Sequence, residues 1–396
     1  MGEKIKFIDG KLFVPVNPEI VYIKGDGIGP EIMEASMFVW NKAVEKVYSG
    51  KRKIHWKEVL IGESALKEYG TLLPEDTIKE IEEHVIAIKS PVKTPVGGGY
   101  RSLNVELRKI FDLYANIRPV RWIEGIPSPL KNPENIDLVI FRENTEDVYA
   151  GLEWPAKSSQ AASVRKFLEE EFNVKLRNDT GIGLKIISEF ATKRIVRKAI
   201  EYAIENNRKK ITIVHKGNIM KYTEGAFLNW AFEVLEKEFG NITSSNEKDG
   251  KIIFNSKIAD DMFQQLILYP QEYDIIVTPN LNGDYLSDAA AALVGGLGIA
   301  PGMNIGDEVA IFEAVHGTAP DIAGKNIANP MSLILSGVLM FRYMGWLEVA
   351  NVIDTAVNET VKSKKVTSDL ATRLNVEPLG TMEFAREIVK NIDQLV

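Results

Sequence analysis

The sequence contains no cysteine and only four histidines in 396 residues. Without cysteine, both a disulfide framework and a thiolate metal site are excluded. No run approaches the ~20 consecutive apolar residues that a membrane helix needs, so we expect no membrane partner. Residues 1–10 lack the apolar core of a signal peptide, and a cytoplasmic location is therefore the default expectation.

Basic residues are also outnumbered by acidic ones. The chain has 48 Lys and Arg and 55 Asp and Glu, which gives a formal net charge of −7. This balance argues against a nucleic-acid-binding module. Hydrophobic residues make up 45% of the chain, and its length exceeds what one core usually covers, so we expect two or three domains. Apolar strands alternate with amphipathic helices, which predicts an α/β architecture of parallel character.

An apolar strand near the N-terminus, residues 20–23, runs into a glycine turn and then a long amphipathic helix. The glycines are Gly25, Gly27 and Gly29, and Pro30 stands where the dinucleotide fingerprint G-x-G-x-x-G requires its third glycine. We therefore predict a different kind of glycine turn rather than a standard Rossmann site.

The chain is organised around residues 89–121, which begin with a turn-rich loop containing Pro91, Pro95 and Gly97 to Gly99. Three consecutive glycines let a ligand approach the main chain closely. A helix is predicted to follow, with Ser102 as its N-cap. Its buried face is expected to be formed by the apolar residues at helical spacing, Leu103, Leu107, Ile110, Phe111 and Tyr114.

This stretch also carries four guanidinium groups within twenty-one residues, those of Arg101, Arg108, Arg118 and Arg121. One interpretation is a solvated basic face beside a glycine linker. The other is an anion pocket in which arginines bind carboxylates through two hydrogen bonds each. In that pocket Ser102 and Asn104 would orient the ligand, and Asn104 and Arg108 share one helix face because they are four residues apart.

Further polar residues follow buried strands, where side chains of an α/β protein tend to face the ligand crevice. Arg142 comes directly after the apolar run of residues 136–141, and Tyr149 lies shortly beyond it. Lys216 follows another strand and is a candidate base if its pKa is lowered. The alternatives are a packed aromatic side chain for Tyr149 and a surface lysine for Lys216.

Carboxylates suggest a metal. Asp284 and Asp288 are four residues apart, so a helix would place both on one face, and Asp260 or Asp261 could join them. Such a set suits Mg²⁺ or Mn²⁺, although acids at a helix start are also favoured by the helix dipole. His316, in a loop broken by glycine and proline, could stack on a base ring, whereas His55 and His84 are expected to be structural.

Several long segments resemble a known family, the metal-dependent decarboxylating dehydrogenases of isocitrate and isopropylmalate, and the match runs from about Val21 to the C-terminus. They are RSLNVELR, FRENTEDVYAGLEW, VHKGNIMKYTEGAF, NLNGDYLSDAAAALVGGLGIAPG and HGTAP. The Ser102–Asn104 pair resembles the isocitrate-specific members, since isopropylmalate enzymes carry apolar residues there.

The resemblance implies the family's own α/β fold, not a standard Rossmann fold. A large cofactor domain would comprise residues 1–113 and 295–396, and a small dimerisation and catalytic domain residues 114–146 and 189–294. A clasp, residues 147–188, would interlock with the second subunit of an obligate homodimer.

The resemblance also implies the role of each site residue. The carboxylates of isocitrate would be held by Ser102, Asn104, Arg108, Arg118 and Arg142. Tyr149 would protonate the enol after decarboxylation, and Lys216 would serve in removing the hydroxyl proton. Mg²⁺ or Mn²⁺ would be held by Asp260, Asp284 and Asp288, with Lys216 and Asp260 reaching in from the partner subunit.

For the cofactor, the resemblance implies contacts from Lys93, Thr94, His316, Gly317, Thr318, Ala319, Asp321, Ile322 and Asn329. NADP-using relatives carry Lys and Tyr where this chain has Asp321 and Ile322. A carboxylate accepts hydrogen bonds from ribose hydroxyls and repels a 2′-phosphate. Small Ala328, and Ser368 and Thr372 in place of Tyr and Arg, point the same way, so we predict NAD.

The predicted activity is thus NAD-dependent oxidative decarboxylation of isocitrate to 2-oxoglutarate and CO₂, a reaction of the tricarboxylic acid cycle. One alternative is an NADP-dependent or dual-cofactor isocitrate dehydrogenase, and another is the same chemistry on homoisocitrate or isopropylmalate. A non-catalytic regulatory subunit would lack the tyrosine, the lysine or the aspartates, and this chain keeps them all.

Overall fold

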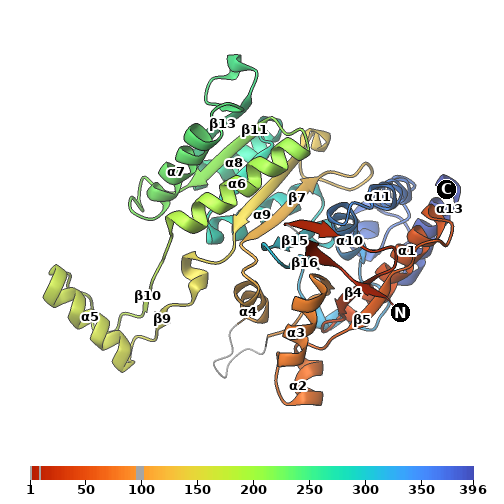
Figure 1. Cartoon of the computed structure of the whole chain (residues 1–396), viewed down its shortest axis with the longest axis horizontal. Coiled ribbons are helices and arrows are strands. Elements are labelled where there is room, and N and C mark those ends of the chain that lie inside the picture. The colour runs from red at the N-terminus through yellow and green to blue at the C-terminus, as the bar shows by residue number, and fades with distance from the viewer. Residues whose placement is uncertain (1, 9, 95–101) are drawn as a thin grey trace.

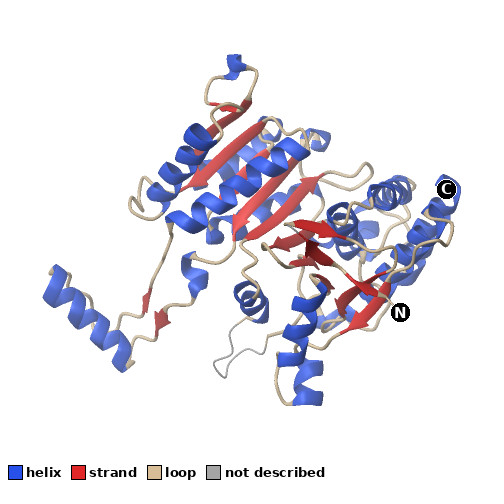
Figure 2. Ribbon diagram, viewed as in Figure 1, coloured by secondary structure: helices blue, strands red, loops and turns tan. Residues whose placement is uncertain are grey.

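One continuous mixed sheet forms the centre of the molecule (Figure 1). The structure is a computed structural model that describes residues 2–8, 10–94 and 102–396. Within these residues the sheet has twelve strands in the order β1-β4-β6-β16-β15-β7-β8-β14-β11-β13-β12, with β5 beside β4. Helices cover both of its faces (Figure 2), so the α/β prediction is confirmed.

The first lobe holds the parallel strands at one end of the sheet. These are β1 (Glu3–Lys4), β4 (Pro18–Ile23), β5 (His55–Glu58), β6 (Ile86–Lys89) and β16 (Ala310–Ala314). Its helices are α1 (Gly29–Val47), α2 (Glu63–Tyr69), α3 (Glu75–His84), α4 (Leu103–Ile110), α10 (Met331–Tyr343), α11 (Leu347–Lys362), α12 (Ser368–Leu374) and α13 (Thr381–Leu395). A small hairpin of β2 (Lys6–Ile8) and β3 (Lys11–Phe13) lies outside the main sheet.

The second lobe holds the parallel strands at the other end. These are β8 (Asp137–Glu143), β11 (Lys210–His215), β12 (Thr243–Ser244), β13 (Ile252–Ile258) and β14 (Ile275–Thr278). Its helices are α6 (Glu189–Glu205), α7 (Glu224–Glu233), α8 (Ala259–Leu268) and α9 (Asn280–Val294). Strand β14 is buried throughout, as expected of a parallel strand covered by helices on both faces.

Antiparallel pairing joins the two lobes at the middle of the sheet. Strand β15 (Pro301–Ile305) runs antiparallel to β16 and to β7 (Ala115–Arg121), and β7 runs antiparallel to β8. The strands of the two lobes therefore point in opposite directions. The sheet continues from one lobe into the other and therefore marks no domain boundary. The domain boundaries expected from the resemblance stay a prediction.

A slender arm leaves the second lobe between β8 and α6 (Figure 1). It contains the short antiparallel strands β9 (Glu153–Trp154) and β10 (Ile182–Gly183) and the helix α5 (Ser159–Phe172). Phe167 and Phe172 on α5 are 54% and 61% exposed. The segment expected to be a clasp thus projects from the body and carries exposed apolar side chains. None of the helices in the described residues is long and apolar enough to cross a bilayer.

Candidate functional site

A stripe of buried polar side chains crosses one face of the central strands. Strand pairing places its members on the same face, because Lys89 pairs with Glu313, and Asn304 pairs with Asn116, which pairs with Arg142. We call this set the polar stripe: Lys89, Glu313, Asn304, Asn116, Arg118 and Arg142. None of its members is more than 8% exposed, so each must find a partner inside the protein.

Hydrogen bonds run along the stripe from one lobe to the other. Lys89 Nζ lies 2.7 Å from Glu313 Oε2, and Asn304 Nδ2 donates to Glu313 Oε1 at 2.7 Å. Asn116 Nδ2 donates to Asn304 Oδ1 at 2.7 Å, and Arg118 Nε donates to Asn116 Oδ1 at 3.0 Å. This chain of bonds holds Arg118 at a defined position.

Three guanidinium groups lie together at the polar stripe. Two belong to its own members, Arg118 and Arg142, and the third belongs to Arg108. Arg108 comes from α4, which packs on this face, and its Nη2 donates to Glu313 Oε1 at 3.1 Å. Burial lowers the pKa of Arg118, and the charge of Arg108 lowers it further. Burial, Arg108 and Arg118 together lower the pKa of Arg142 to about 10, although Asp284 opposes them. The three cations therefore lie close enough to repel one another.

Helix α9 supplies the partners of two of these arginines. Arg118 Nη1 donates to Ser287 Oγ at 2.9 Å and to Asp288 Oδ1 at 3.0 Å. Arg142 Nε donates to Asn280 Oδ1 at 2.8 Å, and its Nη1 bonds to Asp284. The helix can approach because residue 283 is glycine, where a Cβ atom would lie 2.6 Å from Arg142 Cγ.

Two polar atoms at this place are buried without a hydrogen-bond partner among the described residues, Arg142 Nη2 and Asn104 Oδ1. Asn104 lies one turn before Arg108 on α4, and Ser102 is exposed at the start of that helix. Of the predicted substrate residues, the structure brings Arg108, Arg118 and Arg142 together. An anion would satisfy the free donor and reduce the repulsion among the three cations.

Tyr149 belongs to the same group. Its hydroxyl donates to Asp284 Oδ2 at 2.6 Å, and Arg142 lies 4.9 Å above its ring centroid. Burial and the bond to Asp284 raise its pKa, so the phenol keeps its proton at neutral pH. A tyrosine in this state can act as a proton donor.

Lys216 and Asp260 form a second group. Lys216 follows β11, Asp260 lies in the first turn of α8, and the two side chains form an ion pair. Their side chains are 29% and 70% exposed. In the described part of the chain, no hydrogen bond or ion pair joins Lys216 or Asp260 directly to Tyr149, Arg142 or Asp284. Within one subunit, therefore, the predicted catalytic residues fall into two groups.

The predicted metal ligands are divided in the same way. Asp284 and Asp288 lie one turn apart on α9, and their side chains are 34% and 50% exposed. Burial alone would raise the pKa of Asp284, but Arg142, Tyr149 and Arg118 together outweigh it and lower the pKa. The described residues contain no cluster of three acidic or histidine side chains gathered for a metal. Two hard oxygen donors fit part of a Mg²⁺ or Mn²⁺ site, and the third ligand must come from elsewhere.

The predicted cofactor residues lie around the loop after β16. Its backbone accepts a bond from the glycine turn, since Ile28 N donates to Thr318 O at 2.9 Å and a Cβ on Gly27 would collide with that carbonyl. Ala319 has a positive φ of 38° and begins a short 3-10 helix, Pro320–Ile322, on which Asp321 is exposed. The glycine turn thus supports this loop, as a turn other than a Rossmann fingerprint.

His316, Asn329, Lys93 and Thr94 flank this loop or the start of α4. Burial lowers the pKa of His316, and its Nε2 is buried with no hydrogen-bond partner in the part of the chain that the structure describes. Asn329 Nδ2 donates to Asp369 Oδ2 at 3.0 Å. Lys93 pairs with Glu63 at 2.9 Å, and Thr94 Oγ1 accepts from Leu103 N at 3.1 Å. Thr94 rather than Ser102 therefore caps α4 with its side chain.

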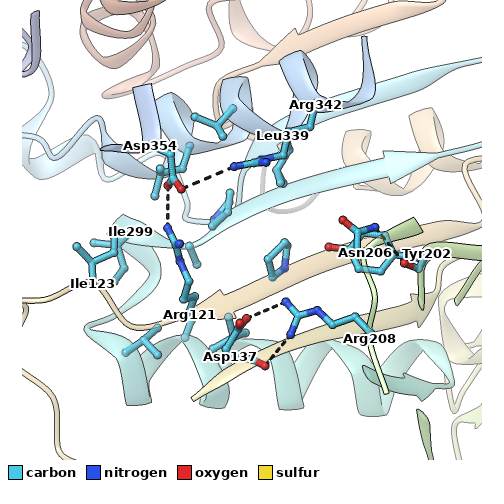
Figure 3. A pocket seen from close by; sticks show the side chains of 18 residues that line it. Arg121, Ile123, Asp137, Tyr202, Asn206, Arg208, Ile299, Leu339, Arg342 and Asp354 are labelled. Atoms are coloured by element: carbon cyan, nitrogen blue, oxygen red, sulfur yellow. Dashed lines mark hydrogen bonds and ion pairs between the residues drawn. The ribbon is translucent and has the colours of Figure 1, made fainter. Parts of the chain in front are cut away.

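The arginines of the sequence stretch do not all join the site. Arg101 and the glycines Gly97 to Gly99 lie outside the described residues. Arg121 turns away, and with Asp354, Arg342, Arg208 and Asp137 it lines a cavity of about 260 Å³ (Figure 3). None of the predicted site residues lines that cavity.

Comparison with known proteins shows which family the chain belongs to. The family model described as isocitrate/isopropylmalate dehydrogenase matches residues 19–388. The chain belongs to this family. It is 54% identical to the NADP isocitrate dehydrogenase of Archaeoglobus fulgidus, covering 100% of this chain and 97% of that one, and 51% identical to that of Pseudomonas aeruginosa, covering 97% of each. The crystal structure of isocitrate dehydrogenase from Methylococcus capsulatus matches with a TM-score of 0.80 at 38% identity, over 94% of this chain and 99% of that one.

These relatives correct the cofactor prediction. Full-length family members at about half identity are named for NADP, so the prediction of an NAD-dependent enzyme with NAD as cofactor is wrong. The inference relied chiefly on the Asp321 carboxylate, with Ile322, Ala328, Ser368 and Thr372 as further support. That carboxylate is exposed, where solvent screens it, and Lys325 is exposed four residues further along the same loop. One surface charge therefore does not decide whether a 2′-phosphate is accepted.

Several residues that position the candidate site were not predicted from the sequence. Lys89 and Glu313 lie inside apolar strands, IAIK and AIFEA. A charged residue in such an apolar run is expected to be buried beside an opposite charge. This rule would have predicted that Lys89 and Glu313 form a buried ion pair. Asn116, Asn304 and Ser287 carry no comparable signal, because their roles depend on strand register.

Proposed function

We propose that the protein catalyses the NADP- and metal-dependent oxidative decarboxylation of isocitrate to 2-oxoglutarate and CO₂. The observation that carries the proposal is the convergence of Arg108, Arg118 and Arg142 on the polar stripe, where Arg142 Nη2 has no partner among the described residues. Such a site suits a small polycarboxylate, because each carboxylate can accept two charge-assisted hydrogen bonds. The full-length relatives named as NADP isocitrate dehydrogenases support the same substrate and cofactor.

In this proposal the arginines, with Ser102 and Asn104, bind and orient the substrate. Lys216 would take the proton of the substrate hydroxyl group. The nicotinamide of NADP, when bound, would accept the hydride from the carbon that bears this hydroxyl. The carboxylate on the adjacent carbon then leaves as CO₂, and the electrons of the broken bond form an enolate. Tyr149, whose raised pKa keeps it protonated, donates a proton to that adjacent carbon. Mg²⁺ or Mn²⁺, held by Asp284, Asp288 and Asp260, would polarise the oxygen on the reacting carbon as a Lewis acid.

For the cofactor we propose contacts from the residues around the loop after β16 and the start of α4. These are Lys93, Thr94, His316, Gly317, Thr318, Ala319, Asp321, Ile322 and Asn329. The partnerless Nε2 of His316 supports this, since a buried polar atom is expected to find a hydrogen bond in the complex. The test is a set of initial rates with isocitrate and Mn²⁺, using NADP or NAD.

We expect kcat/KM to be higher with NADP by about tenfold or more, since specificity is a ratio of such values. Homoisocitrate and isopropylmalate serve as control substrates in the same assay. Absence of isocitrate turnover with both cofactors would reject the proposed reaction, whereas turnover with NAD alone would reject only the cofactor.

We further propose a homodimer in which each active site takes Lys216 and Asp260 from the second subunit. Three observations support this: the separation of the two residue groups in one chain, the projecting arm with exposed Phe167 and Phe172, and the loop after Lys216, where Ile219 and Tyr222 are 69% and 92% exposed. Large exposed apolar side chains are typical of interfaces. We propose the same domain division as predicted from the sequence, with residues 147–188 as the clasp between the two subunits.

Mixed dimers test the sharing. Tyr149→Phe and Lys216→Met chains should each be inactive alone, but their random mixture should recover about a quarter of wild-type activity, because half the dimers contain one intact site. The control is a mixture of Tyr149→Phe with Arg142→Met, which changes the same group in both chains and should recover none. Equal results in the two mixtures would contradict shared sites.

A further inference from the structure

Lys185 forms a buried cluster with two carboxylates beneath the site. It lies between β10 and α6, and its Nζ is 2.6 Å from Asp147 Oδ1 and 2.9 Å from Glu224 Oε1. The side chain of Lys185 is 16% exposed, whereas those of Asp147 and Glu224 are 1% and 0% exposed. Two carboxylates so fully buried need a cation between them. None of these three residues is among those proposed to bind the substrate.

Asp147 connects the cluster to the group that contains Tyr149. Its backbone has a positive φ of 68°, and it starts the short 3-10 helix Asp147–Ala150, which carries Tyr149. Asp147 Oδ1 accepts from Val148 N at 2.7 Å, and Oδ2 accepts from Leu281 N at 3.0 Å in the first turn of α9. One carboxylate therefore fixes both Tyr149 and the helix that carries Asp284.

Glu224 connects the cluster to the other group. Its Oε2 accepts from the backbone N–H of Lys216 at 2.5 Å and from Asn282 Nδ2, again on α9, at 2.8 Å. Lys216 stands directly after β11, at the point where its loop begins, so this bond sets the direction in which the loop leaves the strand. Lys185 is thus the link through which the two carboxylates meet.

We propose that Lys185 is a positioning residue that holds the Tyr149 group and the Lys216 loop in register with each other. The inference depends on the proposed function, in which these groups serve the two different active sites of a dimer. Removal of the Lys185 charge would leave two adjacent buried carboxylates that repel one another, so both functional segments would shift. Misplacement of a reacting group by about 1 Å can cost about 100-fold in rate.

The test compares Lys185→Met with Lys193→Met. Lys193 is a matched control, because it also pairs with two carboxylates, Glu189 at 2.6 Å and Glu233 at 2.9 Å, and is 19% exposed, but it bonds to no predicted site residue. For Lys185→Met we expect kcat to fall by about 10- to 100-fold while KM for isocitrate changes by less than about threefold, since supporting residues typically act on this scale. Lys193→Met should leave both values near those of the wild type.

Lys185→Arg, which keeps the charge, should recover most of the lost kcat, a rescue that a general loss of stability would not give. If Lys185→Met does not fold, Lys185→Gln takes its place in the same comparison. Wild-type kcat in Lys185→Met and Lys185→Gln, or equal losses in Lys185→Met and Lys193→Met, would overturn the inference. Inactive wild-type protein would instead reject the proposed function, so the two failures are distinguishable.

Discussion

The two faces of the central strands carry contrasting arginine clusters. On one face, Arg118 of β7 and Arg142 of β8 lie buried with Arg108, and burial and mutual repulsion lower the pKa values of Arg118 and Arg142. On the other face, Arg121 and Asp137, which pair across β7 and β8, line the cavity in Figure 3.

The cavity arginines are already neutralised. Arg121 donates to Asp354 at 2.8 Å, and Arg208 pairs with Asp137 at 2.8 Å and with Asp274 at 2.9 Å. Burial would lower the pKa of Arg208, but Asp137 and Asp274 outweigh it and raise the pKa. The difference between the two clusters shows what to look for in an anion site. A cluster of arginines indicates such a site only where the guanidinium groups repel one another and an N–H donor lacks an acceptor.

The largest effect is expected from Arg142→Met. It removes a buried guanidinium whose loss should cost about 2–5 kcal/mol of substrate binding in the transition state, a decrease in kcat/KM of about 30- to 4000-fold. Arg208→Met is the matched control on the opposite face and should stay within about threefold of the wild type. Steady-state kinetics with isocitrate measures both, and similar losses in the two variants would contradict the contrast between the faces.

Much of this contrast was open to prediction from the sequence. The α/β class was predicted from local pattern and is confirmed. Local pattern also singled out Arg108, Arg118 and Arg142, which the structure brings together. The grouping of Arg121 with Arg118 was wrong for a physical reason: the segment is a strand, and residues three apart on a strand point to opposite faces. Strand alternation, applied to ANIRPVR, would have separated them.

Other errors came from features that no local pattern encodes. The helix predicted to extend to Tyr114 ends at Ile110, which is 46% exposed, because the chain turns at Asp112 with a φ of 45°. The bonds of Asn116 and Asn304 depend on register between strands almost 190 residues apart in sequence. The cofactor was predicted wrongly from five residues, Asp321, Ile322, Ala328, Ser368 and Thr372, whose joint effect on a bound cofactor no local pattern gives.

An effect of similar size concerns stability and again separates the faces. Glu313→Gln leaves Lys89 and Arg108 buried without their carboxylate, and breaking such a buried pair typically costs about 3–5 kcal/mol of unfolding free energy. Asp354→Asn, which weakens the pairs with Arg121 and Arg342, should cost about 0–1 kcal/mol because both arginines are partly exposed. Denaturant unfolding measures both values, and equal costs would refute the distinction.

A smaller effect should appear on acidification. Burial alone would raise the pKa of Glu313, but Lys89 and Arg108 outweigh it and hold the pKa far below its usual range. The folded state therefore binds fewer protons than the unfolded state in mild acid, and the stabilisation is lost as the pH falls below about 4.3. Melting temperatures between neutral pH and the acid range should fall more steeply for wild type than for Glu313→Gln, and parallel curves would contradict this assignment.

The smallest effect is expected from Arg121→Ala. Its side chain is 47% exposed, and its bond to Asp354 crosses from β7 to α11, so the unfolding free energy should change by only about 0–1 kcal/mol. KM for isocitrate should not change, because Arg121 points away from Arg118 and Arg142. Added salt should shrink the small stability difference further, since exposed pairs are screened. A marked rise in KM would mean that the two faces communicate, and the cavity would then have to be counted as part of the active site.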